Sequence, residues 1–402
     1  SAQPGTAVVG TVSGTSISFG TPVLFESGQA EYITATYDST NSKVIIAYQD
    51  NGDSNKGKAV VGTVSGTSIS FGSAAVFESG EATYIAATHD STNDKVVVVY
   101  RDGANSSYGT AAVGTVSGTS ISFGTPVVFY SGTVSFVGST FDSNSGKVVI
   151  AYRDGSDSNH GKARVGTVSG TSISFGSAVE YNTGNTPYNA LTFDSTNNKV
   201  ILAYRDVSNS NYGTARVGTV SGTSISFGSE SVFESGESNY IQVNYDSANQ
   251  KVLITYRDED NSGDGTSVVG TVSGTSISFG TPVVFFTGAP SYLGAAYVGS
   301  NKFVNAYQDN TDNNYGKAVV FTSSSVTTNL TAENYIGIAG EAISNGATGK
   351  VTIFGGTNSG QTGLTTAQTY YVQNDGSLST TAGNPSVVAG TSISSTKIIV
   401  KG

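Results

Sequence analysis

The chain repeats one segment of 52 residues, and this repeat restricts the fold more than any other feature. The string VVGTVSGTSISFG recurs with few changes, beginning at Val8, Val60, Ala112, Arg164, Arg216 and Val268. A seventh, degraded copy, AVVFTSSS, begins at Ala318. A fixed period of this size is typical of stacked or circular arrays in which each repeat is one supersecondary unit.

Each repeat predicts four short strands, which we call a, b, c and d. In the first repeat they are AVVGTVS (7–13), TSISFGTPVLF (15–25), YITATYD (32–38) and KVIIAYQD (43–50). Strand d is almost wholly apolar, as in a strand covered on both faces, whereas strand b alternates. Strand c carries small residues that suit a crowded axis. We therefore predict the order c, d, a, b from axis to rim, with Gly14 at positive φ in the a–b turn.

Six such units predict an all-β chain whose residues 1–327 form a six-bladed β-propeller, because four strands in 52 residues is the size of one propeller blade. Strand a occurs seven times and the other strands six times. A ring would therefore complete its last blade by joining strands c and d near Tyr292–Tyr307 to the N-terminal strands a and b. Either the copy at Ala318 displaces the N-terminal strand, or it leads the chain out of the ring.

Residues 328–402 lose the period and predict a second, small β-barrel or sandwich domain, which would dock or oligomerise. The segment from Tyr335 resembles the segment from Ser386, and TYYVQNDGSLSTT lies between them. Its Asn374-Asp375-Gly376 sequence predicts a hairpin turn.

Composition excludes several classes of function. The chain is 37% hydrophobic and 12% charged, so it can bury a large core. A net charge of -10 without a run of Lys or Arg argues against nucleic acid as a partner. No apolar stretch approaches the roughly 20 residues of a membrane helix, so we predict no membrane insertion. The absence of Cys excludes disulfides and thiolate zinc sites.

Candidate ligand-binding residues lie on the face that carries the d–a and b–c connections. Every strand c begins with an aromatic residue: Tyr32, Tyr84, Phe136, Tyr188, Tyr240 and Tyr292. Four strands d end in Tyr-Arg-Asp, with the arginines Arg101, Arg153, Arg205 and Arg257. The aromatic rings either pack between blades or stack on sugar rings. The triplet is typical of a structural role because it recurs in blade after blade, whereas an active site needs different residues from different blades.

Metal-ligating residues are sparse. Asp258, Asp260 and Asp264 offer oxygen ligands for Ca²⁺, although the loop lacks the distal Glu of an EF-hand. The only histidines, His89 and His160, occupy positions where other repeats have Tyr or Phe. We therefore predict no catalytic residues, no histidine zinc site and no cofactor other than calcium.

The order YIAATHDSTNDKVVVVYRD…GTVSGTSISFGSAAVF is similar to the neuraminidase-type (Asp-box) propeller repeat. SGTSISF takes the place of the Asp-box hairpin, with Ser where the Asp would be and Phe where the Trp would be. The near-identical repeats, followed by LTAENYIGIAGEAISNGATG and the rest of the C-terminal segment, resemble tandem-repeat β-propeller proteins of tailed phages, of the tail-fibre or virion-associated type.

This resemblance and the repeat together imply a non-enzymatic structural and adhesion protein on a virion or extracellular surface. It would bind a repetitive ligand such as polysaccharide, with host-surface glycans or other virion proteins as partners and a homo-oligomer formed through the C-terminal domain. Two alternatives stay open at this point. One is a sialidase-like glycosidase, and the other is a purely structural subunit of a filament or shell.

Overall fold

The computed structural model describes residues 3–322, 337–339, 350–353, 355–372, 377–382 and 386–401. The chain divides into two compact units, Ser1–Ser323 and Ser324–Gly402. The predicted boundary between residues 327 and 328 lies outside the described residues. Within them the structure consists of strands and one 3₁₀ turn, η1 (Asn51–Asp53), which confirms the all-β prediction. No helix of the described part is long and apolar enough to cross a membrane.

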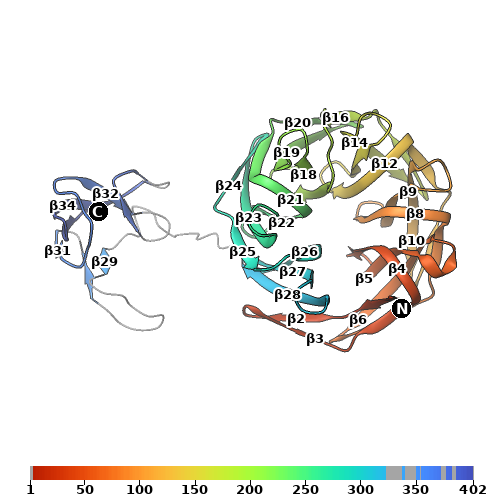
Figure 1. The fold of residues 1–402 in the computed structure, drawn as a ribbon, viewed down its shortest axis with the longest axis horizontal. Coiled ribbons are helices and arrows are strands. Elements are labelled where there is room, and N and C mark those ends of the chain that lie inside the picture. The colour runs from red at the N-terminus through yellow and green to blue at the C-terminus, as the bar shows by residue number, and fades with distance from the viewer. Residues whose placement is uncertain are drawn as a thin grey trace. The chain divides into compact units, whose positions relative to one another are not determined.

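Strands of the first unit pair in groups about a common axis, each group around one d strand and called a sheet below, and shared strands join several groups into larger sheets of 14 and 9 strands (Figure 1). We number them 1 to 6 by their d strands, which are β5 (Lys43–Asp50), β9 (Lys95–Asp102), β13 (Lys147–Asp154), β18 (Lys199–Asp206), β22 (Lys251–Asp258) and β27 (Lys302–Asp309). The a strands are β1 (Pro4–Ala7) with β2 (Gly10–Ser13), then β6 (Lys56–Ser65), β10 (Tyr108–Ser117), β14 (His160–Ser169), β19 (Tyr212–Ser221), β23 (Asp264–Ser273) and β28 (Tyr315–Thr322). The short b strands are β3 (Ser16–Phe19), β7 (Ser68–Phe71), β11 (Ser120–Phe123), β15 (Ser172–Phe175), β20 (Ser224–Phe227) and β24 (Ser276–Phe279).

The predicted strand b (15–25) ends at Phe19 in the structure, and its last residues, from Val23, are continuous with strand c, so here the prediction was wrong. One strand of 16 residues runs from the outer edge of one sheet to the inner edge of the next, as in β4 (Val23–Asp38), β8 (Ala75–Asp90), β12 (Val127–Asp142) and β21 (Ser231–Asp246). In two repeats this strand is broken, giving β16 (Val179–Asn182) with β17 (Ala190–Asp194), and β25 (Val283–Phe286) with β26 (Ser291–Gly299). Pro187 and Pro290 lie in the two breaks, because proline cannot donate to a β ladder.

Backbone pairing confirms the strand order within a sheet. In sheet 2, β9 pairs antiparallel with the inner half of β8 and with β10. The other edge of β10 pairs with β11 and with the first residues of β12. The order is therefore c, d, a, b, with strand c innermost.

The core lies between adjacent sheets. Residues 96–100 of β9 are fully buried, and they alternate between two hydrophobic clusters. Val98 packs in one cluster and Val99 in the other, so both faces of the central strand are covered. Each fully buried Val contributes about 1.5–3 kcal/mol, which explains why strand d lacks the alternating pattern of a half-exposed strand.

The repeated SGTSISFG hairpin is the contact between successive sheets. A Cβ built on Gly72 would lie 1.8 Å from the carbonyl oxygen of Thr119 in the next hairpin. The same approach recurs at Gly20, Gly124, Gly176 and Gly228, with distances of 1.9, 2.1, 1.8 and 1.9 Å. Glycine is required there by close approach, whereas Gly14 in the a–b turn has φ of +61°, as predicted.

The seam of the array lies between β28 and the N-terminal hairpin. β28 pairs with β27 over its whole length, so the copy at Ala318 takes the place of strand a in sheet 6. The first of the two alternatives left by the sequence is therefore correct. β2 and β3 form a two-stranded sheet, and β3 lies against β28 (Figure 1). Within the described residues no backbone pairing joins β28 to β3.

The second unit contains β29 (Ile338–Ala339), β30 (Val351–Thr352), β31 (Thr357–Asn358), β32 (Thr369–Val372), β33 (Leu378–Ser379), β34 (Val387–Ser394) and β35 (Lys397–Val400). Five of these form an antiparallel sheet in the order β31-β35-β34-β32-β33. Tyr370, Val387, Ala389 and Ile398 belong to its buried core. β32 and β33 pair as the predicted hairpin requires, while Asn374-Asp375-Gly376 itself lies outside the described residues.

Candidate ligand-binding face

Six aromatic side chains form one continuous series around the axis, at the first residue of each strand c. Successive ring centroids lie 5.4, 5.2, 5.1, 5.6 and 5.9 Å apart along the series Tyr32, Tyr84, Phe136, Tyr188, Tyr240 and Tyr292. We call these residues the aromatic series. The sequence predicted each member, and the structure adds that each ring from Tyr32 to Tyr240 contacts the ring of the next sheet.

The backbone of the aromatic series is left-handed at every member. Their φ values run from 48° to 60°, a region that bulky residues rarely adopt. In sheet 2 the ladder between β8 and β9 shifts register between Thr83 and Ala86, so Tyr84 lies in a bulge. A residue held in such a conformation costs about 1–3 kcal/mol, and such strain is concentrated at functional sites. Six repetitions of it indicate that the direction of the rings is fixed by the fold.

Arginine covers the four central members of the series. The guanidinium carbons of Arg101, Arg153, Arg205 and Arg257 lie 5.0, 4.7, 5.3 and 5.0 Å from the ring centroids of Tyr84, Phe136, Tyr188 and Tyr240. Their other contacts fix them in place, as shown by Arg101 Nε, which donates to Thr83 Oγ1 at 2.8 Å. Burial lowers the pKa of Arg153, which nevertheless stays cationic because guanidinium groups titrate so high.

The first and last rings of the series, Tyr32 and Tyr292, have no arginine over them in the described part of the chain. Gln49 and Gln308 replace arginine in sheets 1 and 6, and no cation lies over Tyr32 or Tyr292 among the described residues. Tyr32 is 40% exposed and Tyr292 75% exposed, so these rings are open to solvent. Burial and the neighbouring Tyr84 still raise the pKa of Tyr32, which therefore remains a neutral phenol at physiological pH. The face thus offers open aromatic rings at the seam and arginine-covered rings elsewhere.

The other members of the Tyr-Arg-Asp triplet have structural contacts. Tyr100 is fully buried and donates to Glu78 at 3.0 Å. Asp102 accepts the backbone N–H of Asn105 at 3.0 Å and so holds the d–a loop. The equivalent Asp154 and Asp206 hold their loops in the same way.

An axial cavity of about 410 Å³ is lined by strand c from all six sheets. Its polar lining comes from Thr34, Ser139, Asn189 and Gln242, and the remaining residues are apolar or small. The lining contains neither a carboxylate nor an arginine. General acid–base hydrolysis of a glycoside needs paired acids, so this cavity lacks the groups that the glycosidase alternative requires.

A second, polar pocket of about 360 Å³ lies beside β16, within the size range of small-molecule sites. Asn182 donates to Asp206 at 2.9 Å and to Glu230 at 3.1 Å, and Arg216 lies 3.7 Å from Glu230. The sequence analysis missed this pocket. Its signal is the sequence NTGNTPY, which places Asn182 where the three repeats with an ESG sequence have Glu.

One position beside the d–a loops is Lys in sheets 1, 3 and 6 and Thr in sheets 2, 4 and 5. In sheets 1, 3 and 6 this lysine forms an ion pair at 2.7–2.8 Å with the Asp that begins the d–a loop. The pairs are Lys58–Asp50, Lys162–Asp154 and Lys317–Asp309. Sheets 2 and 5 have Thr110 and Thr266 at this position, and each hydroxyl is buried without a hydrogen-bond partner. Burial, and then Glu78 or Glu234, raise the pKa of the loop residues Asp102 and Asp258.

Two of the three calcium candidates accept hydrogen bonds from different backbone groups. Asp258 accepts from the backbone of Asn261 at 3.2 Å, and Asp264 accepts from Gly288 N at 2.9 Å. Within the described residues, side chains suited to a metal ion gather at two other places. These are Asp38 with His89 and Asp94, and Asp157 with His160 and Glu180, so both histidines lie among carboxylates that sequence reasoning did not connect with them.

Comparison with known proteins agrees with this architecture. The chain is similar to the lectin BP39L from Burkholderia pseudomallei, with a TM-score of 0.59 at 10% identity over 80% of this chain and 93% of that chain. It is also similar to Aleuria aurantia lectin in complex with α-methyl-L-fucoside (TM-score 0.47, 13% identity, 73% and 91% covered). A Trypanosoma rangeli sialidase gives a TM-score of 0.49 at 12% identity, with 87% and 65% covered.

No protein-family model matches the chain, and no curated protein matches it. The fold assignment rests on the first of the three structures, which shows a β-propeller-like fold of the kind found in lectins. An identity of 10% shows the fold alone, so the site must carry the functional argument.

Proposed function

We propose that the protein is a non-enzymatic adhesion protein whose six-bladed propeller binds a repetitive surface glycan through the aromatic series. The observation that carries the proposal is the series itself, in which six rings are held in a strained backbone conformation and four of them lie under arginine. Sugar rings present C–H faces that stack on aromatic side chains, and hydroxyls that accept hydrogen bonds from guanidinium groups.

Repetition supports a polymeric ligand. Similar contact sets from successive sheets would each bind weakly, and simultaneous contact with several sugar units would raise the overall affinity by about 10²–10⁴-fold. A lectin with a similar fold, BP39L, supports a carbohydrate ligand by analogy of fold. The chemistry of the aromatic series supplies the site-level argument for this chain.

The lining of the axial cavity argues against the sialidase-like alternative, because its residues include no acid and no arginine. A turnover assay with sialosides and with the polysaccharide that binds tests this directly. Release of free sugar at a rate above that of a heat-denatured sample would support the glycosidase instead.

We place the protein on a virion or extracellular surface, in the manner of phage tail-fibre or capsid appendages. In this proposal the C-terminal unit is a small β-barrel or sandwich that docks on virion proteins or forms a homo-oligomer. Labelling of intact particles with an antibody against the first unit, viewed by electron microscopy, tests the location. Ordered polymers of the purified chain would favour the purely structural subunit.

A glycan array followed by a whole-cell binding assay tests the adhesion function. The expected result is binding to a polysaccharide class, weakened at least tenfold by Tyr32→Ala together with Tyr292→Ala, the two rings of the series that are open to solvent. A matched control is Tyr212→Ala, which removes an aromatic residue of a d–a loop outside the aromatic series. Absence of binding to any glycan or cell surface would leave only the structural role.

A further inference from the structure

We propose that Asp38, His89 and Asp94 form a site for a divalent first-row transition-metal ion, with Zn²⁺ as the expected occupant, which links sheets 1 and 2. The three side chains lie at the c–d turns, on the face opposite the aromatic series. Asp38 ends β4, His89 is near the end of β8, and Asp94 follows in the turn to β9. The site is therefore separate from the proposed glycan face.

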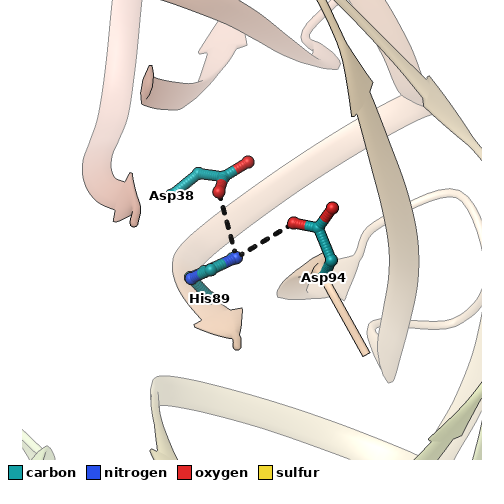
Figure 2. A group of neighbouring side chains, drawn as sticks. All are labelled: Asp38, His89 and Asp94. Atoms are coloured by element: carbon teal, nitrogen blue, oxygen red, sulfur yellow. Dashed lines mark ion pairs between the residues drawn. The ribbon is translucent and has the colours of Figure 1, made fainter. Parts of the chain in front are cut away.

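The donor atoms have the spacing of metal ligands. His89 Nε2 lies 3.2 Å from Asp38 Oδ1 and 3.6 Å from Asp94 Oδ1, and Figure 2 shows the imidazole with this nitrogen facing both carboxylates. All three atoms lie within 4.8 Å of one another. Two donors that are each about 2.1 Å from a tetrahedral ion are about 3.4 Å apart, which falls between the two observed distances.

The imidazole nitrogen is buried without using its hydrogen-bonding capacity. The side chain of His89 is 6% exposed and that of Asp38 is 1% exposed. Although both carboxylates are within ion-pair distance, Asp38 is not aligned to accept a hydrogen bond from Nε2 and Asp94 is too far away, so this nitrogen has no hydrogen-bond partner. A buried polar atom without a partner costs about 1–3 kcal/mol, and a metal ion on its lone pair would remove that cost.

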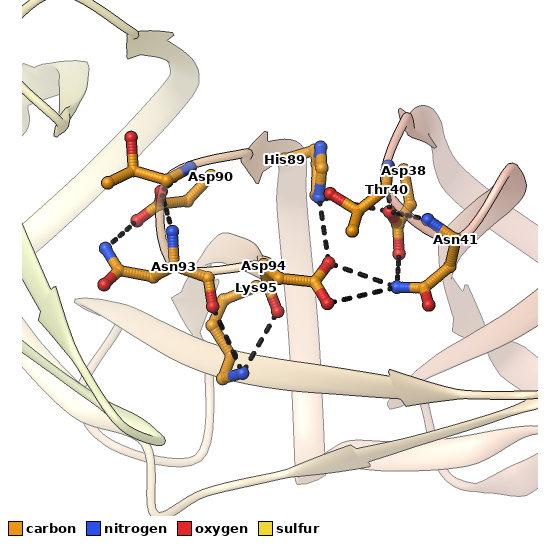
Figure 3. Close-up of polar contacts among 9 residues, drawn as sticks. Asp38, Thr40, Asn41, His89, Asp90, Asn93, Asp94 and Lys95 are labelled. Atoms are coloured by element: carbon orange, nitrogen blue, oxygen red, sulfur yellow. Dashed lines mark hydrogen bonds and ion pairs between the residues drawn. The ribbon is translucent and has the colours of Figure 1, made fainter.

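Neighbouring groups hold the two carboxylates in place. Asp38 Oδ1 accepts the backbone N–H groups of Thr40 and Asn41 at 3.0 and 2.9 Å. Asn41 Nδ2 donates to Asp38 Oδ2 at 2.9 Å and to Asp94 Oδ1 at 3.1 Å, so one amide joins the two acids (Figure 3). Outer contacts of this kind orient metal ligands.

The other junctions of the array show what a purely structural contact looks like. The residue at the position of His89 is Tyr37, Phe141, Phe193, Tyr245 or Tyr297, and the residue at the position of Asp94 is Ser42, Gly146, Asn198, Gln250 or Asn301. In sheet 5, Tyr245 donates to Thr196 of the preceding sheet at 2.7 Å, which joins the two sheets without any ion. Only the junction of sheets 1 and 2 has both a histidine and a second carboxylate, which are the two changes that a metal site needs.

The second histidine cluster is a weaker candidate and serves as the internal control. Glu180 and Asp157 are 39% and 47% exposed, and Lys162 already pairs with Asp157 at 2.6 Å.

One imidazole and two carboxylates, as in the site at His89, suit Zn²⁺, and Mn²⁺ or Co²⁺ would bind them less tightly. The chain has no Cys and only two His, so few other groups compete for the ion.

Calorimetric titration of the full chain, without an affinity tag, with Zn²⁺ tests the site, with Co²⁺ absorption as a second readout. We expect one equivalent to bind to the His160→Tyr protein. His89→Tyr, which copies sheets 1, 5 and 6, and Asp94→Asn, which copies sheets 4 and 6, should each weaken this binding at least tenfold in that background. Melting in EDTA at the temperature of the parent protein would show that these variants fold.

Loss of all binding in His160→Tyr would overturn the proposal, as would binding unchanged by His89→Tyr. Zn²⁺ should also raise the melting temperature of the His160→Tyr protein and leave that of the double variant His89→Tyr/His160→Tyr unchanged, because an ion that joins two sheets binds only the folded state. Failure of the glycan-binding proposal would not affect this result, since the two sites lie on opposite faces.

Discussion

Replacement of Gly176 by Ala should destabilise the first unit because it pushes two neighbouring hairpins apart. A Cβ at this position would lie 1.8 Å from the carbonyl oxygen and 2.9 Å from the carbonyl carbon of Thr223. Ordinary contact between a methyl carbon and an oxygen is about 3.3 Å, so the backbones of the two neighbouring hairpins must separate by more than about 1 Å. Overpacking of this kind costs about 1–3 kcal/mol, and a backbone obstacle lies at the upper end of that range.

The same chain supplies the control. Gly280 is the equivalent residue of the last hairpin, and a Cβ added there would have Val269 O as its nearest neighbour, at 3.7 Å and within its own sheet. Gly280→Ala should therefore be neutral or should raise the free energy of unfolding by about 0.4–1 kcal/mol, through the entropy of the unfolded chain. Neither glycine has a positive φ, so conformational strain does not distinguish the two substitutions.

Urea denaturation followed by circular dichroism measures the difference. We expect the free energy of unfolding of Gly176→Ala to fall about 2–4 kcal/mol below that of Gly280→Ala, with similar m-values. Equal stability of the two variants would refute the idea that each hairpin rests on the next.

Three further predictions follow from the charges and rings of individual sheets. Thr110→Lys should raise the free energy of unfolding at pH 7 by about 1 kcal/mol, because the ammonium group of the new lysine would pair with Asp102 as Lys58 pairs with Asp50. Urea denaturation measures this change, and a fall in stability would contradict the prediction. The pKa of Asp102 in the folded protein is raised above its unfolded value of about 3.9. Its protonated form therefore contributes stability that is present below about pH 3.9 and is lost as the pH rises through the folded pKa. The free energy of unfolding, measured against pH, should show this loss in the parent protein and a smaller loss in Thr110→Lys. Tyr292→Ala, at the most exposed ring of the aromatic series, should weaken glycan binding in a plate assay while leaving the urea midpoint unchanged, and a shifted midpoint with unchanged binding would assign the ring to packing.

Much of the fold could be predicted because the same pattern of apolar and small residues recurs in six repeats of the sequence. The continuous apolar runs of strand d placed it at the centre of each sheet, and the small residues of strand c placed it at the axis. Sequence could not show that the end of the predicted strand b and strand c are one strand, because the residues between them, such as ESGQAE, look like a loop and are extended only by pairing with strands a and d. Pro187 and Pro290 mark the two repeats in which β16 and β25 still pair with strand a but end before the segment reaches strand c.

The aromatic series could be located from sequence as a list of positions, since aromatic residues recur every 52 residues. Its left-handed backbone and the guanidinium groups over its rings could not, because they depend on a bulge and on the pairing of β8 with β9. The cluster around His89 was missed for a related reason. Asp38 and His89 are 51 residues apart and meet only because the ends of neighbouring inner strands lie side by side.

A crystal structure of the protein with a glycan selected on the array tests the central claim most directly. The account predicts sugar rings stacked on members of the aromatic series, with hydroxyls or carboxylates of the ligand bonded to the arginines that cover them. Sugar bound only elsewhere, for example in the pocket beside Asp206 or at the c–d turns, would contradict it.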